Sequence, residues 1–100
     1  MAEESRIERI VSAYAIKLGC YARKFSSPAQ RGVPDRIFIS PGGLLFFIEF
    51  KSPGKKMSAL QEREKRLIEK CSALHFVVDN VTTGKQIIDD AVRRSPKRTK

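Results

Sequence analysis

Three charged residues in the middle of the chain have the types and the spacing of a catalytic site. Asp35 begins one apolar stretch, and Glu49 and Lys51 end the next. Side chains alternate along a β-strand, so Glu49 and Lys51 share one face while Phe50 points to the other. Charges at the end of an apolar strand cost free energy unless they have partners. The pattern therefore predicts a polar site at this point of the chain.

A divalent cation would remove the repulsion between the carboxylates of Asp35 and Glu49. A turn at Pro41-Gly42-Gly43 lies midway between Asp35 and Glu49, so a hairpin would bring both carboxylates to its open end. Two carboxylates held together repel, whereas Mg²⁺ favours one or two carboxylates together with waters and phosphate oxygens. With Lys51 facing a water or a phosphate, such a site would support metal-assisted hydrolysis of a phosphodiester. The alternative from these residues alone is a surface hairpin whose charges form ion pairs.

Hydrophobic periodicity and turn residues predict seven elements in the order αβββαβα. Capping-box patterns, Ser58 with Gln61 and Thr83 with Gln86, indicate the starts of the second and third helices. This order predicts an α/β domain with a mixed sheet flanked by helices. The expected elements are a helix over 3–19, strands over 21–25, 33–40 and 44–51, a helix over 58–71, a strand over 74–78 and a final helix carrying Ile87, Ile88, Ala91 and Val92.

Length and composition indicate one intracellular domain. The chain has 100 residues, and no apolar run approaches the roughly 20 needed to span a bilayer. The acidic start at Glu3 and Glu4 is unlike a secretory signal. Two cysteines, Cys20 and Cys71, make neither a disulfide framework nor a zinc site. We therefore expect a cytoplasmic protein with reduced thiols and no membrane partner.

The charge distribution favours a polyanionic partner. Lys and Arg number 20 against 11 acids, a formal net charge of +9, and residues 93–100 are basic without any acid. Nucleic acid is the partner that such a balance suits, and the alternative is a solubilising surface with a disordered tail. We expect a folded domain over 1–92 and a disordered basic tail over 93–100. The cations that flank the acids, and so the candidates for nucleic-acid contact, are Lys24, Arg31, Arg36, Lys55 and Lys56.

A longer string of residues resembles a known family. The pair Pro34-Asp35 with Glu49-Phe50-Lys51 is similar to the signature of the PD-(D/E)xK nuclease superfamily. Within that superfamily the chain resembles the virus-type replication-repair nuclease (VRR-NUC) domain of stand-alone phage and bacterial proteins, from Ile7 to Val92. The segments that carry this resemblance are Gly32-Val33-Pro34-Asp35-Arg36, Phe47-Ile48-Glu49-Phe50-Lys51-Ser52-Pro53-Gly54, and Ser58 with Gln61.

The resemblance implies a restriction-endonuclease-like core and specific roles for its residues. Mg²⁺ or Mn²⁺ would be held by Asp35, Glu49 and the backbone carbonyl of Phe50. Lys51 would orient or deprotonate the attacking water, or stabilise charge on the phosphate. The catalytic set would be completed by Glu8 of the first helix, with Glu4 as the alternative, and by Gln61, for which helix capping is an equally good interpretation.

The function implied is a metal-dependent DNA endonuclease that selects Holliday junctions or other branched DNA in replication, recombination or repair. A symmetric homodimer is expected, because resolving a four-way junction needs two symmetric cuts. The helix over 3–19, or the final helix with Ile87, Ile88 and Val92, would form its interface. No phosphate-binding loop is present, so no nucleotide cofactor is expected. Two alternatives stay open: a non-catalytic nucleic-acid-binding module, which the clustered acids argue against, and a nuclease subunit that acts only with a larger partner.

Overall fold

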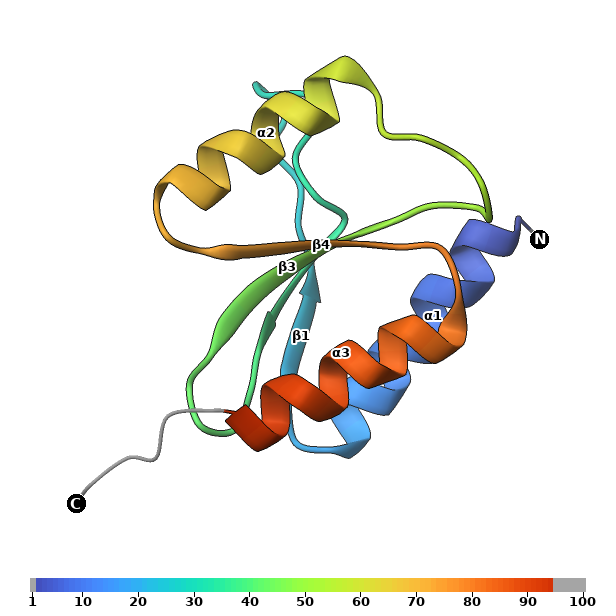
Figure 1. The fold of residues 1–100 in the computed structure, drawn as a ribbon, viewed down its shortest axis with the longest axis vertical. Coiled ribbons are helices and arrows are strands. Elements are labelled where there is room, and N and C mark those ends of the chain that lie inside the picture. The colour runs from blue at the N-terminus through green and yellow to red at the C-terminus, as the bar shows by residue number, and fades with distance from the viewer. Residues whose placement is uncertain (1, 95–100) are drawn as a thin grey trace.

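The chain folds into a four-stranded mixed sheet with helices on both sides (Figure 1), which confirms the predicted class and order of elements. The computed structural model describes residues 2–94. The sheet has the order β1-β2-β3-β4, in which the first three strands are antiparallel and β3 and β4 are parallel. The elements are α1 (Glu3–Lys17), β1 (Tyr21–Lys24), β2 (Arg36–Ile39), β3 (Leu45–Phe50), α2 (Ala59–Lys70), β4 (Leu74–Val78) and α3 (Val81–Arg94).

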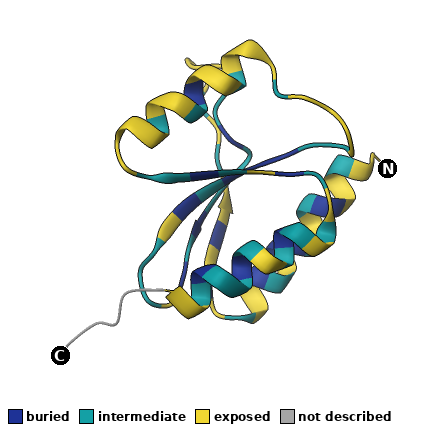
Figure 2. Ribbon diagram, in the orientation of Figure 1, coloured by how far each residue is buried: buried dark blue, intermediate teal, exposed yellow. Residues whose placement is uncertain are grey.

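The core lies between the sheet and the pair of helices α1 and α3. Figure 1 shows α1 and α3 together on one side of the sheet and α2 on the other. The buried residues of Figure 2 follow this division, because they line the strands and the inner sides of α1 and α3 while α2 is largely exposed. The core side chains are Ile7, Val11, Ala15, Cys20, Ala22, Phe38, Phe46, Ile48, Phe50, Val78, Ile88 and Ala91.

This packing corrects the expected dimer interface. Helices α1 and α3 pack against each other, and Ile7, Val11 and Ile88 are fully buried within the chain. The apolar face of the first helix is therefore internal. In the final helix Ile88 is also unavailable to a second copy, and Ile87 and Val92 are half-buried against the same core. A periodic stripe in the sequence marks a buried face without showing which surface buries it.

The starts of β2 and α3 differ from the sequence-based expectation. Strand β2 begins at Arg36 rather than at residue 33, because Pro34 has no N–H for a sheet hydrogen bond. Helix α3 begins at Val81, and its cap is Asn80, whose side-chain oxygen accepts a 2.7 Å hydrogen bond from the backbone N–H of Thr83. The expected capping box of Thr83 with Gln86 is therefore wrong, since both residues lie inside the helix.

The end of α3 also shortens the expected tail. Arg93 and Arg94 are helical and form ion pairs with Asp90 at 2.9 and 2.8 Å, so the tail does not begin at residue 93. The prediction of a disordered basic tail otherwise falls on residues 95–100, which lie outside the described residues. Over residues 2–94, no helix combines the length and the apolar character needed to cross a membrane.

Candidate active site

The hairpin of β2 and β3 brings Asp35 and Glu49 together, as the sequence predicts. Arg36 of β2 pairs with Ile48 of β3, so the residues just beyond this pair, Asp35 and Glu49, lie at the same open end. The carboxylate oxygen Oδ2 of Asp35 accepts a 2.7 Å hydrogen bond from the backbone N–H of Phe50. The backbone carbonyl of Asp35 accepts another, at 2.9 Å, from the N–H of Phe25. Asp35 is therefore fixed through both its side chain and its backbone.

Glu49 is the most enclosed acid of this site. Its side chain is 2% exposed. Its oxygen Oε2 accepts a 2.6 Å hydrogen bond from Nε2 of Gln61 and lies 3.7 Å from Nζ of Lys51. The second oxygen, Oε1, is buried and has no hydrogen-bond partner among the described residues. Leaving a buried acceptor unpaired costs about 1–3 kcal/mol, and more for a charged group.

The surroundings of the two acids disfavour their ionisation. Burial, together with the charge of Asp35, raises the pKa of Glu49 from 4.5 to about 8, although nearby Lys51 opposes the shift. Burial also raises the pKa of Asp35, against the lowering effect of the hydrogen bond from Phe50. Without a cation, the pair therefore shares a proton near neutral pH rather than carrying two full charges.

This donor set fits a hard divalent cation. The unpaired Oε1 of Glu49 and the carboxylate of Asp35 would supply oxygen ligands, which Mg²⁺ and Mn²⁺ prefer. Within residues 2–94 no three His, Cys, Asp or Glu side chains come together as a ready-made metal cage. Two carboxylates are nevertheless the number that Mg²⁺ takes when waters and substrate phosphates complete its shell. The carbonyl of Phe50, next to Glu49 in the chain, stays a predicted ligand.

Glu8 is held by cations instead of joining the two acids. Its Oε2 lies 2.7 Å from Nε of Arg36 and 3.0 Å from Nζ of Lys24. Its charge still raises the pKa of Asp35. The role of Glu8 as a third ligand stays a prediction, and so does that of the alternative Glu4, whose charge raises the pKa of both Asp35 and Glu49.

Gln61 caps α2 and also contacts Glu49, while its catalytic role stays a prediction. At the third position of α2 it forms a capping box with Ser58, in which Oε1 of Gln61 accepts from the N–H of Ser58 at 2.9 Å. Its amide nitrogen meanwhile donates to Glu49. The start of α2 therefore positions the buried carboxylate, and Gln61 links helix capping to the site.

The predicted nucleic-acid contacts divide into two groups. Arg36 and Lys24 pair with Glu8, and the Arg36 side chain is only 19% exposed. Arg31, Lys55 and Lys56 are exposed and form no ion pair within the described chain. The Glu8 network, which joins α1 to β1 and β2, was missed by sequence reasoning because no local spacing signals it.

Gly32 lets the loop before Asp35 approach α2. Its φ is +90°, and a Cβ at this position would lie 2.6 Å from the backbone carbonyl carbon and oxygen of Leu60, the residue before Gln61. Gly32→Ala is therefore expected to lower the free energy of unfolding by more than the roughly 1–3 kcal/mol of backbone strain alone. Thermal and urea unfolding would measure the loss.

Gly54→Ala is the matched control for Gly32→Ala. Gly54 has a similar φ of +79°, but nothing lies within 4 Å of the position its Cβ would take. The control carries the strain without the clash, so it should cost less stability. Equal losses in the two variants would show that the contact between the loop and α2 does not matter.

Comparisons with known proteins agree with this fold. No model of a protein family matches the chain. A relative named "Putative nuclease p44", from Acyrthosiphon pisum secondary endosymbiont phage 1, is 42% identical over 64 residues, which are 64% of this chain and 69% of the relative. A solved structure described as a VRR_NUC domain superposes with a TM-score of 0.79 at 27% identity, covering 94% of this chain and 98% of that chain. With this fold and this likeness, the chain belongs to the VRR-NUC family of the PD-(D/E)xK nuclease superfamily.

Proposed function

We propose that the protein hydrolyses phosphodiester bonds of DNA with Mg²⁺ or Mn²⁺ held by Asp35, Glu49 and the carbonyl of Phe50. The observation that carries the proposal is the buried Glu49, with one oxygen unpaired and a raised pKa beside a second acid. A fold maintains such an arrangement at a cost, and a bound cation offsets that cost by pairing with both carboxylates. Membership of a nuclease family supports the same reading.

Each residue of the site has a defined part in this chemistry. A bound cation supplies Lewis-acid stabilisation and a more acidic water. Asp35 and Glu49 would hold the cation, and Gln61 fixes one oxygen of Glu49 by a hydrogen bond. Lys51, whose Nζ lies 3.7 Å from that oxygen, faces the reacting phosphate or the attacking water. There it orients or deprotonates the water, or stabilises charge that develops on the phosphate.

The charge of the molecule supports DNA as the substrate. The chain carries a formal net charge of +9, and Arg31, Lys55 and Lys56, which flank the acids in the sequence, are exposed. A module that only bound nucleic acid would gain nothing from clustered acids, which repel phosphates.

We further propose selectivity for branched DNA and a homodimeric active form. One domain with one site makes one cut, whereas the resolution of a four-way junction needs two cuts related by two-fold symmetry. Because the inner faces of α1 and α3 are buried in the core, the interface belongs elsewhere.

Single-stranded, duplex, flap and four-way DNA, incubated with the protein in Mg²⁺ or Mn²⁺, test this selectivity. We expect cleavage of the junction at least about tenfold faster than that of the single strand, a difference of ~1.4 kcal/mol in activation free energy. Sedimentation at micromolar concentration is expected to report a mass near twice 11.3 kDa. A monomer that cuts every substrate at the same rate would contradict both parts.

A further inference from the structure

The outer face of α2 carries a row of cations that no acid neutralises. Arg63, Arg66 and Lys70 are exposed, and their spacing of three and four residues places them on one side of the helix. None of the three forms an ion pair within residues 2–94, whereas neighbouring Lys65 pairs with Glu69 at 2.6 Å. We call Arg63, Arg66 and Lys70 the α2 ridge.

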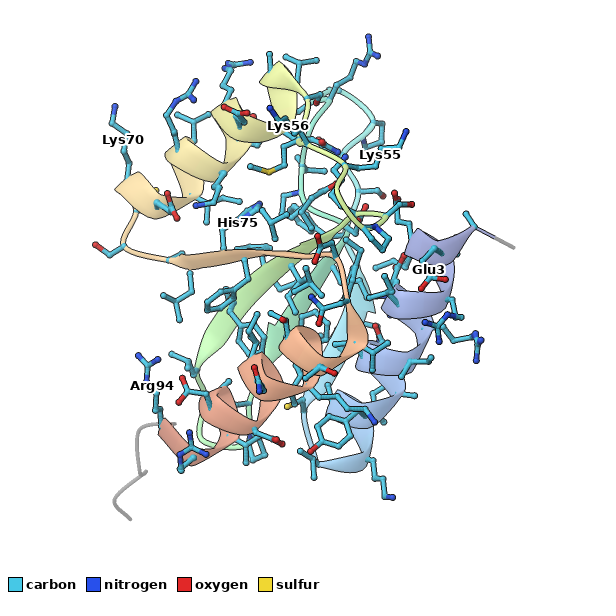
Figure 3. All side chains as sticks on the ribbon, turned by 45° about the vertical axis from the view of Figure 1, so that its right-hand side comes forward. Glu3, Lys55, Lys56, Lys70, His75 and Arg94 are labelled. Atoms are coloured by element: carbon cyan, nitrogen blue, oxygen red, sulfur yellow. The ribbon has the colours of Figure 1, made fainter. Side chains whose placement is uncertain are left out.

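The α2 ridge faces away from the candidate active site. The opposite side of α2 carries Gln61, which contacts Glu49, and the buried Glu64. In Figure 3, Lys55 and Lys56 lie by the loop that leads into α2, and Lys70 points outward from the far end of the helix. At 1.5 Å per residue, the helix rises about 10 Å from Arg63 to Lys70, which spans roughly three phosphates of one DNA strand.

The surface between these cations suits a sugar-phosphate backbone. A shallow hollow is lined by Arg63, Arg66, Leu67 and Lys70, together with Glu69, which is paired with Lys65. Arginine binds phosphate through a planar fork, and the 44% exposed Leu67 offers an apolar contact for a sugar. A protein partner with an acidic surface is a weaker match, because the ridge is narrow and almost wholly charged.

We propose that the α2 ridge binds a second arm of branched DNA while the first arm occupies the site of Asp35 and Glu49. The inference rests on the proposed DNA cleavage and names the surface that gives it structure selectivity. A helix with its side chains is about 10 Å thick, so a straight duplex at the site does not follow α2 round to its opposite side. A branched molecule has two arms and reaches both sides at once.

The double substitution Arg63→Gln with Arg66→Gln tests the α2 ridge. Glutamine keeps the helix propensity of arginine and removes its charge. Dissociation constants are measured by fluorescence anisotropy in EDTA, from 50 to 200 mM salt, for a four-way junction and a linear duplex of the same sequence. The affinity for the junction is expected to fall about tenfold or more, and its salt slope by about 2, since each phosphate contact contributes about 0.9. The affinity for the linear duplex is expected to change less than about twofold.

Arg9→Gln with Lys17→Gln is the matched control. Both residues are exposed cations of α1 without an ion pair in the described chain, so the control removes the same charge elsewhere. The control should leave the affinities for the junction and the duplex within about twofold of the wild-type values. The loss of two charges that do not contact DNA weakens binding far less than the loss of two direct phosphate contacts. An unchanged affinity of the ridge variant for the junction would overturn the proposal, and so would equal losses for junction and duplex.

Cleavage of the four-way junction by the wild-type protein in Mg²⁺ is followed in parallel. If the wild-type protein does not cut but the ridge variant loses affinity for the junction, the proposed hydrolysis is wrong and the proposal that the α2 ridge binds DNA is supported. If the wild-type protein cuts and the ridge variant binds the junction normally, the ridge proposal fails alone. Thermal unfolding of each variant checks that the fold is retained.

Discussion

Glu49→Gln is expected to reduce DNA cleavage by about a thousandfold or more, since metal-ion stabilisation of the transition state is worth several kcal/mol. Glutamine keeps the shape of the side chain and an acceptor for Gln61, but it removes the charge that would hold a cation. Asp35→Ala should have a comparable effect. Lys51→Ala should cost about 10²–10³-fold, the usual loss for a group that stabilises developing charge. Single-turnover cleavage in Mg²⁺ would measure all three.

Glu62→Gln provides the matched control for these variants. Glu62 is an exposed acid in the first turn of α2, one residue from Gln61, and it forms no ion pair within the described chain. This control should cut DNA at the wild-type rate. Cleavage by Glu49→Gln or Asp35→Ala at the control rate would show that the two acids do not carry the chemistry.

In the metal-free protein, Glu49→Gln is expected to raise thermal stability at high pH. The pKa of Glu49 in the folded protein, about 8, lies above its ordinary value of 4.5, so folding takes up a proton between these pH values. The free energy of unfolding therefore declines as the pH rises through this interval, by up to about 1.4 kcal/mol per pH unit. Glutamine does not titrate, so the variant avoids this loss.

The comparison is made by thermal unfolding in EDTA at pH 5 and at pH 9. Wild type and Glu49→Gln should unfold at similar temperatures at pH 5, where Glu49 is largely protonated. At pH 9 the variant should unfold about 10 °C higher or more, given roughly 4–8 °C per kcal/mol for a domain of this size. Addition of Mn²⁺ should raise the unfolding temperature of the wild-type protein but not that of Glu49→Gln. The same difference between the two proteins at both pH values would contradict the raised pKa.

The sequence predicted most of this site because the relevant information is local. A β-hairpin with a central turn determines which residues meet at its open end, so Asp35 and Glu49 follow from spacing. The capping box at Ser58 likewise follows from residues three positions apart. The mixed sheet and the order of elements follow from hydrophobic periodicity, which reports local structure well.

What the sequence did not predict depends on contacts between distant elements. The ion pairs of Glu8 with Lys24 and Arg36 join α1 to β1 and β2, and they became evident only once the sheet order was known. From the sequence alone the apolar face of α1 predicts an interface, because the packing of α1 against α3 cannot be recognised in the sequence of either helix. The start of α3 differs from the expected one because Asn80 caps the helix three residues before the pattern at Thr83.

The most direct test of the central claim is cleavage by protein that has been stripped of metal and then supplied with Mg²⁺ or Mn²⁺. The site of Asp35 and Glu49 predicts no cleavage in EDTA and full recovery on addition of either ion. Asp35→Ala should stay inactive under both conditions. Cleavage in EDTA at the rate seen with Mg²⁺ would contradict the account, because Asp35 and Glu49 would then act without a cation.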